Sequence, residues 1–243
     1  ALAALRKLPA DTVVSGLNMM TMFRPTYAGP MIDGQIVVDE PGKVYAAGGG
    51  ANVPLIVGAN SMDIGFSMAK SIDEVYAPFG PDRRAAAQAA FDPKGTGDVR
   101  AVGTLVASDT MMVEPARFVA KAWSQAKRPV YAFRFSYVAD SMRKEWPGAP
   151  HATEIPYVFD TVKAKYGEAL TPSDAAMGAL TNAYWVAFAK SGDPNGQGRP
   201  HWPAYEAKGD QILDFANDGA KAGADPWKAR LDLVAQAADA KKP

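Results

Sequence analysis

Residues 53–58, Val-Pro-Leu-Ile-Val-Gly, constrain the fold of this chain more than any other stretch. A short apolar run bounded by turn-forming residues is typical of a strand that is buried on both faces of a sheet. Residues 129–138 are rich in aromatic and β-branched side chains and predict a second core strand. The alanine-rich patterns between the two strands predict helices over residues 82–91, 98–107 and 113–125. These patterns together indicate an α/β fold.

Several weaker patterns add elements outside these two strands. Asp33-Gly34 lies between two apolar pieces and predicts a hairpin turn within a small antiparallel ribbon. Thr171 is a suitable cap for a long helix that ends at Gly192. Residues 211–215 predict a short strand and residues 227–240 a final amphipathic helix. Apolar residues at helical spacing in the long helix are expected in the core: Met177, Leu180, Tyr184 and Phe188.

Composition excludes several classes of partner and site. Of the 243 residues, 26 are Lys or Arg and 26 are Asp or Glu, so no charge excess favours nucleic acid or an anionic membrane. No apolar run is long enough to cross a bilayer. The absence of cysteine excludes disulfides, thiol catalysis and thiolate metal sites. The compartment stays open, with a secreted or periplasmic location favoured; residues 1–10 are not a signal-peptide core.

Two side chains are the candidates for catalysis. Asp63 lies in the loop after the strand at residues 53–58, at the edge of an open α/β sheet where ligands bind. His151, one of only two histidines, follows Gly148 and Pro150 and therefore lies in a turn after the second core strand. An imidazole in a turn suits a catalytic base, but a surface histidine without a role is equally compatible with this stretch.

The remaining candidates have weaker support. An acid followed by a histidine matches the last two members of the α/β-hydrolase triad order, but the nucleophile motif G-x-S-x-G is absent. Ser67 has only the first glycine of that motif and follows the acid, and Ser15 matches no better. The glycines at 48–50 suit an oxyanion or phosphate loop, although a plain loop is favoured.

Metal binding has little support in the sequence. His151 and Glu154 supply half of a metal site, but a third ligand at helical spacing is missing. The second histidine, His201, lies between Pro200 and Trp202 and is interpreted as structural or exposed.

Four segments in order resemble the C-terminal half of a type-B carboxylesterase, the cholinesterase-like branch of the α/β-hydrolases. The sequence Pro-Met-Ile-Asp-Gly at 30–34 resembles the family's Pro-x-x-Asp-Gly, and residues 53–60 resemble the strand before the catalytic acid. Residues 148–159 resemble the histidine loop, and residues 185–195 with 202–205 resemble the C-terminal signature. The resemblance covers most of the chain. It implies that residues 1–243 are the C-terminal portion of one α/β-hydrolase domain, with a mostly parallel central sheet flanked by helices.

The resemblance assigns roles to individual residues. His151 matches the family's catalytic histidine, and Asp63, three residues after Asn60, matches its catalytic acid. The family usually has Glu followed by Gly at that point, whereas here Asp63 is followed by Ile64, so the neighbouring Asp73 and Glu74 remain rivals for the acid. Glu154 also matches the pattern and is expected to hold the histidine loop.

The implied activity is hydrolysis of small-molecule carboxylic esters without a cofactor. The serine and the oxyanion hole are expected on an N-terminal half of the same esterase, which would be a partner for this chain. An inactive cholinesterase-like binding or adhesion protein is the alternative, because such proteins keep the fold and lose the triad. An unrelated α/β binding domain is a third possibility. The ester substrate stays open.

Overall fold

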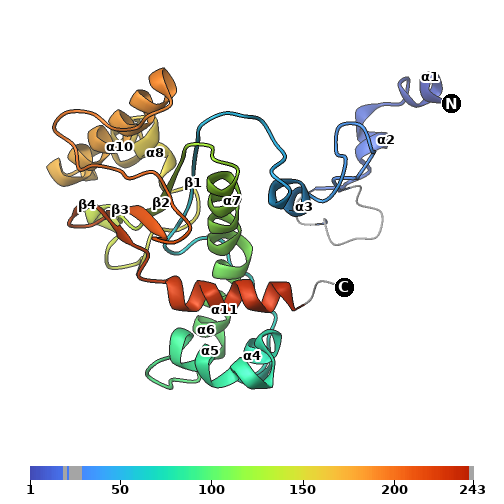
Figure 1. Ribbon diagram of the computed structural model, residues 1–243. Coiled ribbons are helices and arrows are strands. Elements are labelled where there is room, and N and C mark those ends of the chain that lie inside the picture. Colours follow the sequence, from blue (N-terminus) through green and yellow to red (C-terminus); the bar gives the residue numbers. More distant parts are fainter. Residues whose placement is uncertain (19–20, 22–28, 241–243) are drawn as a thin grey trace. The chain divides into compact units, whose positions relative to one another are not determined.

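The computed structural model describes residues 1–18, 21 and 29–240 (Figure 1). The chain divides into two compact units, residues 1–44 and residues 45–243. Each unit is described by itself below.

The first unit consists of short helices and turns. Helices α1 (Leu2–Leu5) and α2 (Ala10–Val14) lie in it, and α3 (Pro41–Ala46) begins in it. The turn predicted at Asp33 is present, because its Oδ1 accepts backbone N–H bonds from Gln35, Ile36 and Val37 at 2.8–3.0 Å. The predicted antiparallel ribbon was wrong, since no strand occurs among the described residues of this unit. The carboxylate takes the backbone donors that a ladder would need.

The second unit is built on a four-stranded sheet of order β1-β2-β3-β4. Strands β1 (Leu55–Asn60), β2 (Val130–Phe135) and β3 (Gln211–Ala216) are parallel, whereas β4 (Gly219–Ala224) is antiparallel to β3. The first three strands confirm the sequence prediction. The fourth was missed because its Gly and Ala residues have low strand propensity, and its position is defined by the hairpin with β3.

Alternation along β2 divides the side chains between the two faces of the sheet. Tyr131 and Phe135 contact a core cluster that includes Met177 and Tyr184 of α10 (Pro172–Ser191). On the other face, Val130 belongs to a cluster with residues of α7 (Glu114–Gln125). Helices therefore cover both faces, as Figure 1 shows for α10 and α7.

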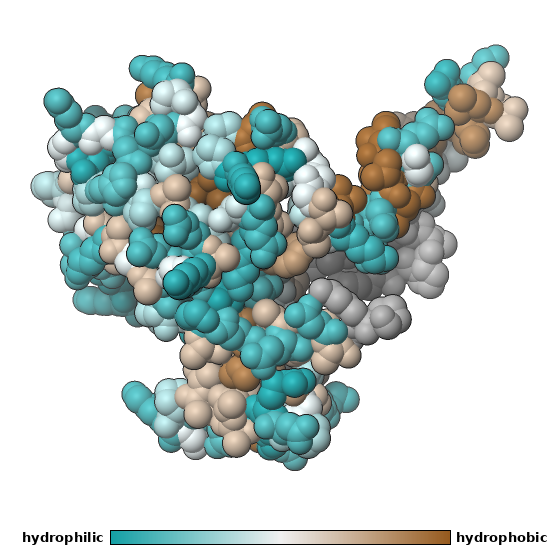
Figure 2. All heavy atoms as spheres, viewed as in Figure 1, coloured by the Kyte–Doolittle hydropathy of each residue, from teal (hydrophilic) through white to brown (hydrophobic). Residues whose placement is uncertain are grey.

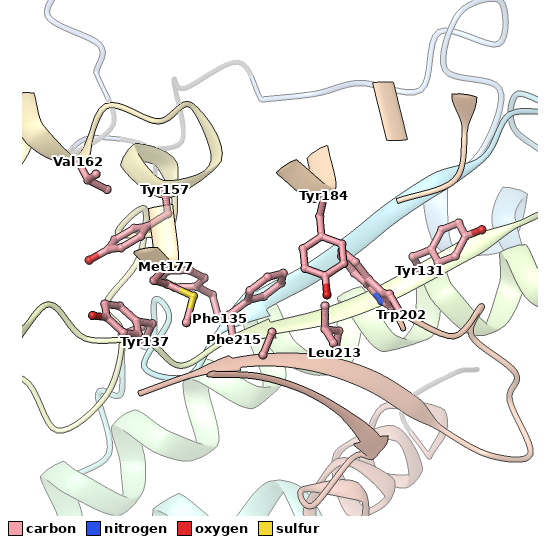
Figure 3. Close-up of a cluster of buried hydrophobic side chains, with 12 residues drawn as sticks. Tyr131, Phe135, Tyr137, Tyr157, Val162, Met177, Tyr184, Trp202, Leu213 and Phe215 are labelled. Carbon is pink, nitrogen blue, oxygen red and sulfur yellow. The ribbon is translucent and has the colours of Figure 1, made fainter. Parts of the chain in front are cut away.

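Aromatic residues dominate the core on the α10 face. The Trp202 indole is fully buried and donates to the backbone oxygen of Ala132 in β2 at 3.0 Å. The rings of Tyr184 and Phe215 lie 5.5 and 5.8 Å from that indole, centroid to centroid. Figure 3 shows the side chains of Tyr184, Trp202 and Phe215 close together beside the strands. Such contacts fix α10 and the Trp202 loop on the strand that leads to His151.

Helices fill the connection between β1 and β2. The three predicted helices are confirmed in position as α5 (Arg84–Phe91), α6 (Val99–Ser108) and α7, and a π-helical turn, η4 (Asp109–Val113), joins α6 to α7. The sequence predicted separate helices over residues 98–107 and 113–125, whereas the chain continues from one to the other through this turn. A further helix, α4 (Ile72–Tyr76), is capped by Ser71, and 3₁₀ turns η2 (Ala77–Phe79) and η3 (Pro81–Arg83) follow it.

The segment after β2 carries the histidine loop and the long helix. The short elements there are η5 (Asp140–Met142), α8 (Ile155–Val158), α9 (Val162–Tyr166) and η6 (Gly167–Ala169). Helix α10 starts with a capping box between Thr171 and Asp174 and ends at Gly192 in the left-handed region, as predicted. The last helix, α11 (Lys228–Asp239), is also confirmed.

The surface is typical of a globular chain. Hydrophilic residues make up much of the visible face of the second unit, with hydrophobic residues scattered among them (Figure 2). Among the helices of the described residues, none has both the length and the hydrophobicity that a bilayer crossing demands.

Candidate active site

The parallel pairing of β1 and β2 defines the position of the candidate site. Register pairs Asn60 with Phe135, so both strands end at the same edge of the sheet. Asp63 lies in the loop after β1, and the chain from β2 reaches this edge again at Pro150, which forms a bridge with Met62. The two candidate side chains are thereby delivered to one point, as is common at the carboxyl edge of α/β sheets.

Asp63 and His151 are in direct contact. Oδ1 of Asp63 lies 2.6 Å from Nδ1 of His151. The Asp63 side chain is 5% exposed, whereas that of His151 is 50% exposed. Within the described residues, nothing hydrogen-bonds to Nε2 of the imidazole. The pair therefore has a buried carboxylate at one ring nitrogen and an accessible second nitrogen, which is the arrangement that a general base needs.

Backbone donors fix the carboxylate. The N–H of Asn60 donates to Oδ2 of Asp63 at 2.9 Å, and the N–H of Ile64 donates to Oδ1 at 2.8 Å. Gly65 allows the loop to pack closely on α6, because a Cβ at this position would lie 2.3 Å from the backbone oxygen of Thr104. The residue that extends the turn relative to the family pattern, Ile64, thus supplies a hydrogen bond to the acid.

The histidine loop is tied to the acid loop by its backbone. Met62 N–H donates to the oxygen of Ala149 at 2.9 Å, and Ala149 N–H donates to Oγ of Ser61 at 2.9 Å. Ala152, directly after His151, has φ of 64° and is therefore in the left-handed region. A non-glycine residue in this conformation indicates local strain beside the imidazole.

The other acidic candidates lie elsewhere. Asp73 forms a surface ion pair with Arg84, and Oε2 of Glu74 accepts the backbone N–H of Lys70 at 2.8 Å. Glu154, expected to hold the histidine loop, accepts a hydrogen bond from Nδ2 of Asn60 at 2.6 Å. Of the three candidates for the catalytic acid, Asp63, Asp73 and Glu74, only Asp63 hydrogen-bonds to His151 within the described residues.

The remaining sequence candidates are not part of this site. Oγ of Ser67 accepts the N–H of Ala69 at 3.3 Å, and Ser15 ends α2 in the first unit. The glycine run at 48–50 presents backbone oxygens of Gly48 and Gly49 to Arg128, not N–H groups to an anion. His201 is exposed. No cluster of three metal-binding side chains occurs in residues 1–18, 21 and 29–240.

A cavity of about 710 Å³ adjoins the acid loop. Both loops and α6 contribute to its wall, together with the ring of Trp227. That ring lies between two guanidinium groups, 3.6 Å from the Cζ of Arg134 and 3.7 Å from that of Arg230. Arg134 is paired in turn with Asp225 through two bonds of 2.7 Å. The Trp227 ring, the two guanidinium groups and Asp225 thus form a charged layer beside the cavity.

Two buried carboxyl groups in the helical connection between β1 and β2 have raised pKa values. Burial raises the pKa of Asp109 to about 6, although its ion pair with Arg230 opposes the shift. Burial likewise raises the pKa of Glu114, at the start of α7, to about 7. Both residues lie in the helical connection that packs on β1.

Sequence reasoning missed the residues that join the two loops. Ser61 and Ala149 join the loops through the serine hydroxyl and the alanine backbone. Neither residue type indicates such a bond in the sequence. Asn60 was noticed only as a marker of distance from the acid. A polar residue at the buried end of a strand was the one available signal for it.

The chain is similar in sequence to known esterases and to a neuroligin. Cocaine esterase of Homo sapiens is 28% identical and is matched over 72% of this chain and 36% of its own length. Fumonisin B1 esterase of Sphingopyxis macrogoltabida is 26% identical over 94% of this chain and 46% of its own length. Neuroligin-2 of Homo sapiens is 26% identical over 80% of this chain and 27% of its own length. The chain thus spans less than half the length of these relatives.

Solved structures show the fold. The structure of PNB esterase superposes with a TM-score of 0.74 at 20% identity and covers 96% of this chain and 50% of the esterase. EstA of Aspergillus niger has a TM-score of 0.67 at 21% identity, over 88% of this chain and 44% of that structure. The expected α/β-hydrolase fold is therefore confirmed. The carboxylesterase family model matches residues 1–233, and this chain belongs to that family.

Proposed function

We propose that this chain is the part of a serine carboxylesterase that carries the acid and the histidine of the catalytic triad. The observation that carries the proposal is the 2.6 Å contact between Oδ1 of Asp63 and Nδ1 of His151. The membership of the carboxylesterase family and the likeness to esterases support the reaction type. The substrate is a small-molecule carboxylic ester, and no cofactor takes part.

The roles in the reaction follow from the two ring nitrogens of His151, Nδ1 beside Asp63 and the accessible Nε2. A serine from an N-terminal part of the esterase attacks the ester carbonyl, and Nε2 of His151 removes the serine proton. The same nitrogen then delivers the proton to the leaving alcohol. In the second half of the reaction, His151 activates a water molecule that attacks the acyl-enzyme and releases the carboxylic acid and the serine. Asp63 keeps the proton on Nδ1 and stabilises the imidazolium. Backbone N–H groups of the same N-terminal part stabilise the oxyanion.

The open edge of the sheet at β1 is evidence for a partner polypeptide. Strand β1 is terminal in the sheet, and no strand of the described residues pairs with its outer edge. Beside it, a groove of about 280 Å³ is lined mostly by apolar side chains, including Ile56 and Trp185, and by Glu154. Phe159 on its rim is 70% exposed. An open parallel edge flanked by exposed apolar surface favours coverage by another strand and helix. We infer that the N-terminal half of the esterase occupies this place, so that residues 1–243 form the C-terminal portion of one α/β-hydrolase domain.

A complementation experiment tests the proposal. The purified chain alone is expected to show no hydrolysis of p-nitrophenyl esters and no labelling by a fluorophosphonate. The chain joined with the N-terminal half should show both, with the label on a serine of that half. Hydrolysis by this chain alone, with the label on one of its own serines, would overturn the split of the triad.

A binding or adhesion function is the second candidate, and the likeness to neuroligin-2 favours it. In that case the residue at the nucleophile position of the N-terminal half is not serine. The completed protein then takes no fluorophosphonate label although its Asp63–His151 contact is present. Labelling of the completed protein decides between the two candidates.

A further inference from the structure

Asn60 contacts both loops of the candidate site. It is the last residue of β1 and is 2% exposed. Its backbone N–H donates to Oδ2 of Asp63 at 2.9 Å, whereas its side-chain Nδ2 donates to the backbone oxygen of Pro150 at 2.7 Å and to Oε2 of Glu154 at 2.6 Å. Pro150 directly precedes His151. One buried residue therefore joins the acid to both sides of the histidine turn.

The chemistry of this position suits an asparagine. A primary amide has two N–H donors in one plane, and both acceptors here are oxygens without a proton to give in return. The amide nitrogen must therefore face them, which excludes the flipped orientation of the side chain. Aspartate has no donor and would repel Glu154, and serine has only one donor. The bond to the Glu154 carboxylate is charge-assisted and is the stronger of the two.

Other ties between the loops do not duplicate this role. The bonds between Ser61, Met62 and Ala149 align the backbones two residues before the histidine. They do not contact Glu154, which lies three residues after His151. Within the turn, the N–H and Oγ1 of Thr153 also donate to the backbone oxygen of Pro150, at 3.2 and 2.7 Å. Among the described residues, the side chain that links Pro150 and Glu154 to each other and to β1 is that of Asn60. The turn includes Ala152 with its positive φ, and the bonds from Asn60 add support from β1 to the bonds that Thr153 makes within the turn.

We propose that Asn60 is a positioning residue that keeps the imidazole of His151 in register with Asp63, with Glu154 as its anchor. Loss of the amide frees the turn around the strained Ala152 and lets the ring move away from Oδ1. The ring then no longer has one preferred tautomer. This inference deepens the proposed function, because the tautomer with the proton on Nδ1 is the one that leaves Nε2 free to accept the serine proton.

The test is nitrogen-15 NMR of the whole chain with labelled histidine. The chain has two histidines, and exposed His201 is the internal reference. In the wild type, the His151 ring is expected as the Nδ1–H tautomer with a slowly exchanging proton. In Asn60→Ala, we expect mixed tautomers and at least ten-fold faster exchange of that proton, with no change at His201. Glu154→Gln keeps an acceptor oxygen and should give a smaller change in the same direction.

Asn182→Ala is the matched control. Asn182 is a half-buried asparagine of α10 whose Nδ2 donates to the backbone oxygen of Val158 at 2.8 Å. It should lower the unfolding midpoint and leave the His151 signals unchanged. If Asn60→Ala also leaves them unchanged, its role is structural and the proposal is wrong. If Asn60→Ala does not fold, Glu154→Gln decides, and wild-type signals in that variant overturn the proposal.

This readout is independent of catalysis. If the completed protein has no esterase activity, the proposed function is wrong, but the NMR result still tests the positioning role. Conversely, an active esterase whose His151 signals do not respond to Asn60→Ala would remove the positioning role alone.

Discussion

The carboxylate of Asp63 lies 2.6 Å from Nδ1 of His151, although 88 residues separate the two along the chain. The contact joins a fully packed acid to a half-exposed ring, so the acid orients the imidazole and the solvent side of the ring stays accessible. In a completed esterase, removing the negative charge should therefore disturb the tautomer more than the fold.

The first prediction concerns Asp63→Asn. We expect kcat of the completed esterase to fall on the order of 10⁴-fold with little change in KM, because an amide stabilises the wrong tautomer. Steady-state hydrolysis of a p-nitrophenyl ester measures this. Asp73→Asn is the control, because Asp73 pairs with Arg84 at the surface. Equal losses in both variants would contradict the assignment of the acid.

The second prediction concerns the strained turn after the histidine. Ala152→Gly should raise the free energy of unfolding by about 0.5–1 kcal/mol, because glycine adopts positive φ without the penalty of a Cβ. Urea unfolding of the chain measures the change. Ala139→Gly is the control, since Ala139 has φ of −52° and glycine should cost stability there. A loss at residue 152 as large as that at residue 139 would show that the turn is not strained.

The third prediction concerns the packing of the acid loop on α6. A Cβ added to Gly65 would lie 2.3 Å from the Thr104 oxygen and 2.6 Å from the Ser108 nitrogen, both backbone atoms that cannot rotate away. Gly65→Ala should therefore lower the free energy of unfolding by about 1–3 kcal/mol. It should also lower the activity of the completed esterase, because the shift reaches Asp63. Gly223→Ala in β4, with open space around it, should be nearly neutral.

The fourth prediction concerns pH. Burial raises the pKa of Glu114 from 4.5 to about 7. Between these values the folded protein keeps a proton that the unfolded chain releases, so the contribution of Glu114 to stability is present at low pH and is lost as pH rises through about 7. Burial raises the pKa of Asp109 to about 6, so its contribution to stability is also lost as the pH rises, through about 6. In Glu114→Gln, the decline in the free energy of unfolding from pH 5 to 7 should be shallower.

Urea unfolding at each pH measures that slope. Glu168→Gln, at an exposed position, controls for the removal of one negative charge. An unchanged slope in Glu114→Gln would mean that the buried carboxyl is already ionised at pH 5.

Local features of the fold could be predicted because their causes are local. Thr171, Pro172 and Gly192 delimit α10 through bonds and dihedral angles within a few residues. The apolar runs at β1 and β2 similarly predict buried strands. The Asp33 turn was predicted correctly, but the ribbon around it was not, because exposed apolar residues such as Ile36 have no second layer in that unit to pack against.

The candidate site was predicted only in part, because local patterns do not show which distant side chains meet. His151 was identifiable from its turn and Asp63 from its place after a strand, and family resemblance favoured this pair over Asp73 and Glu74. Chemistry alone did not separate the three carboxylates, since each follows the same strand. Their catalytic roles remain predictions until the completed protein is assayed.

The sequence by itself determined the α/β pattern, the family and two candidate side chains, because periodicity, capping residues and short motifs act over a few neighbouring positions. Tertiary structure decided which acid meets the imidazole, and it revealed the link from Asn60 to Glu154 across 94 positions. It also revealed the Trp227 ring between Arg134 and Arg230. Such contacts depend on how parallel strands align at one sheet edge, and no local pattern encodes that alignment.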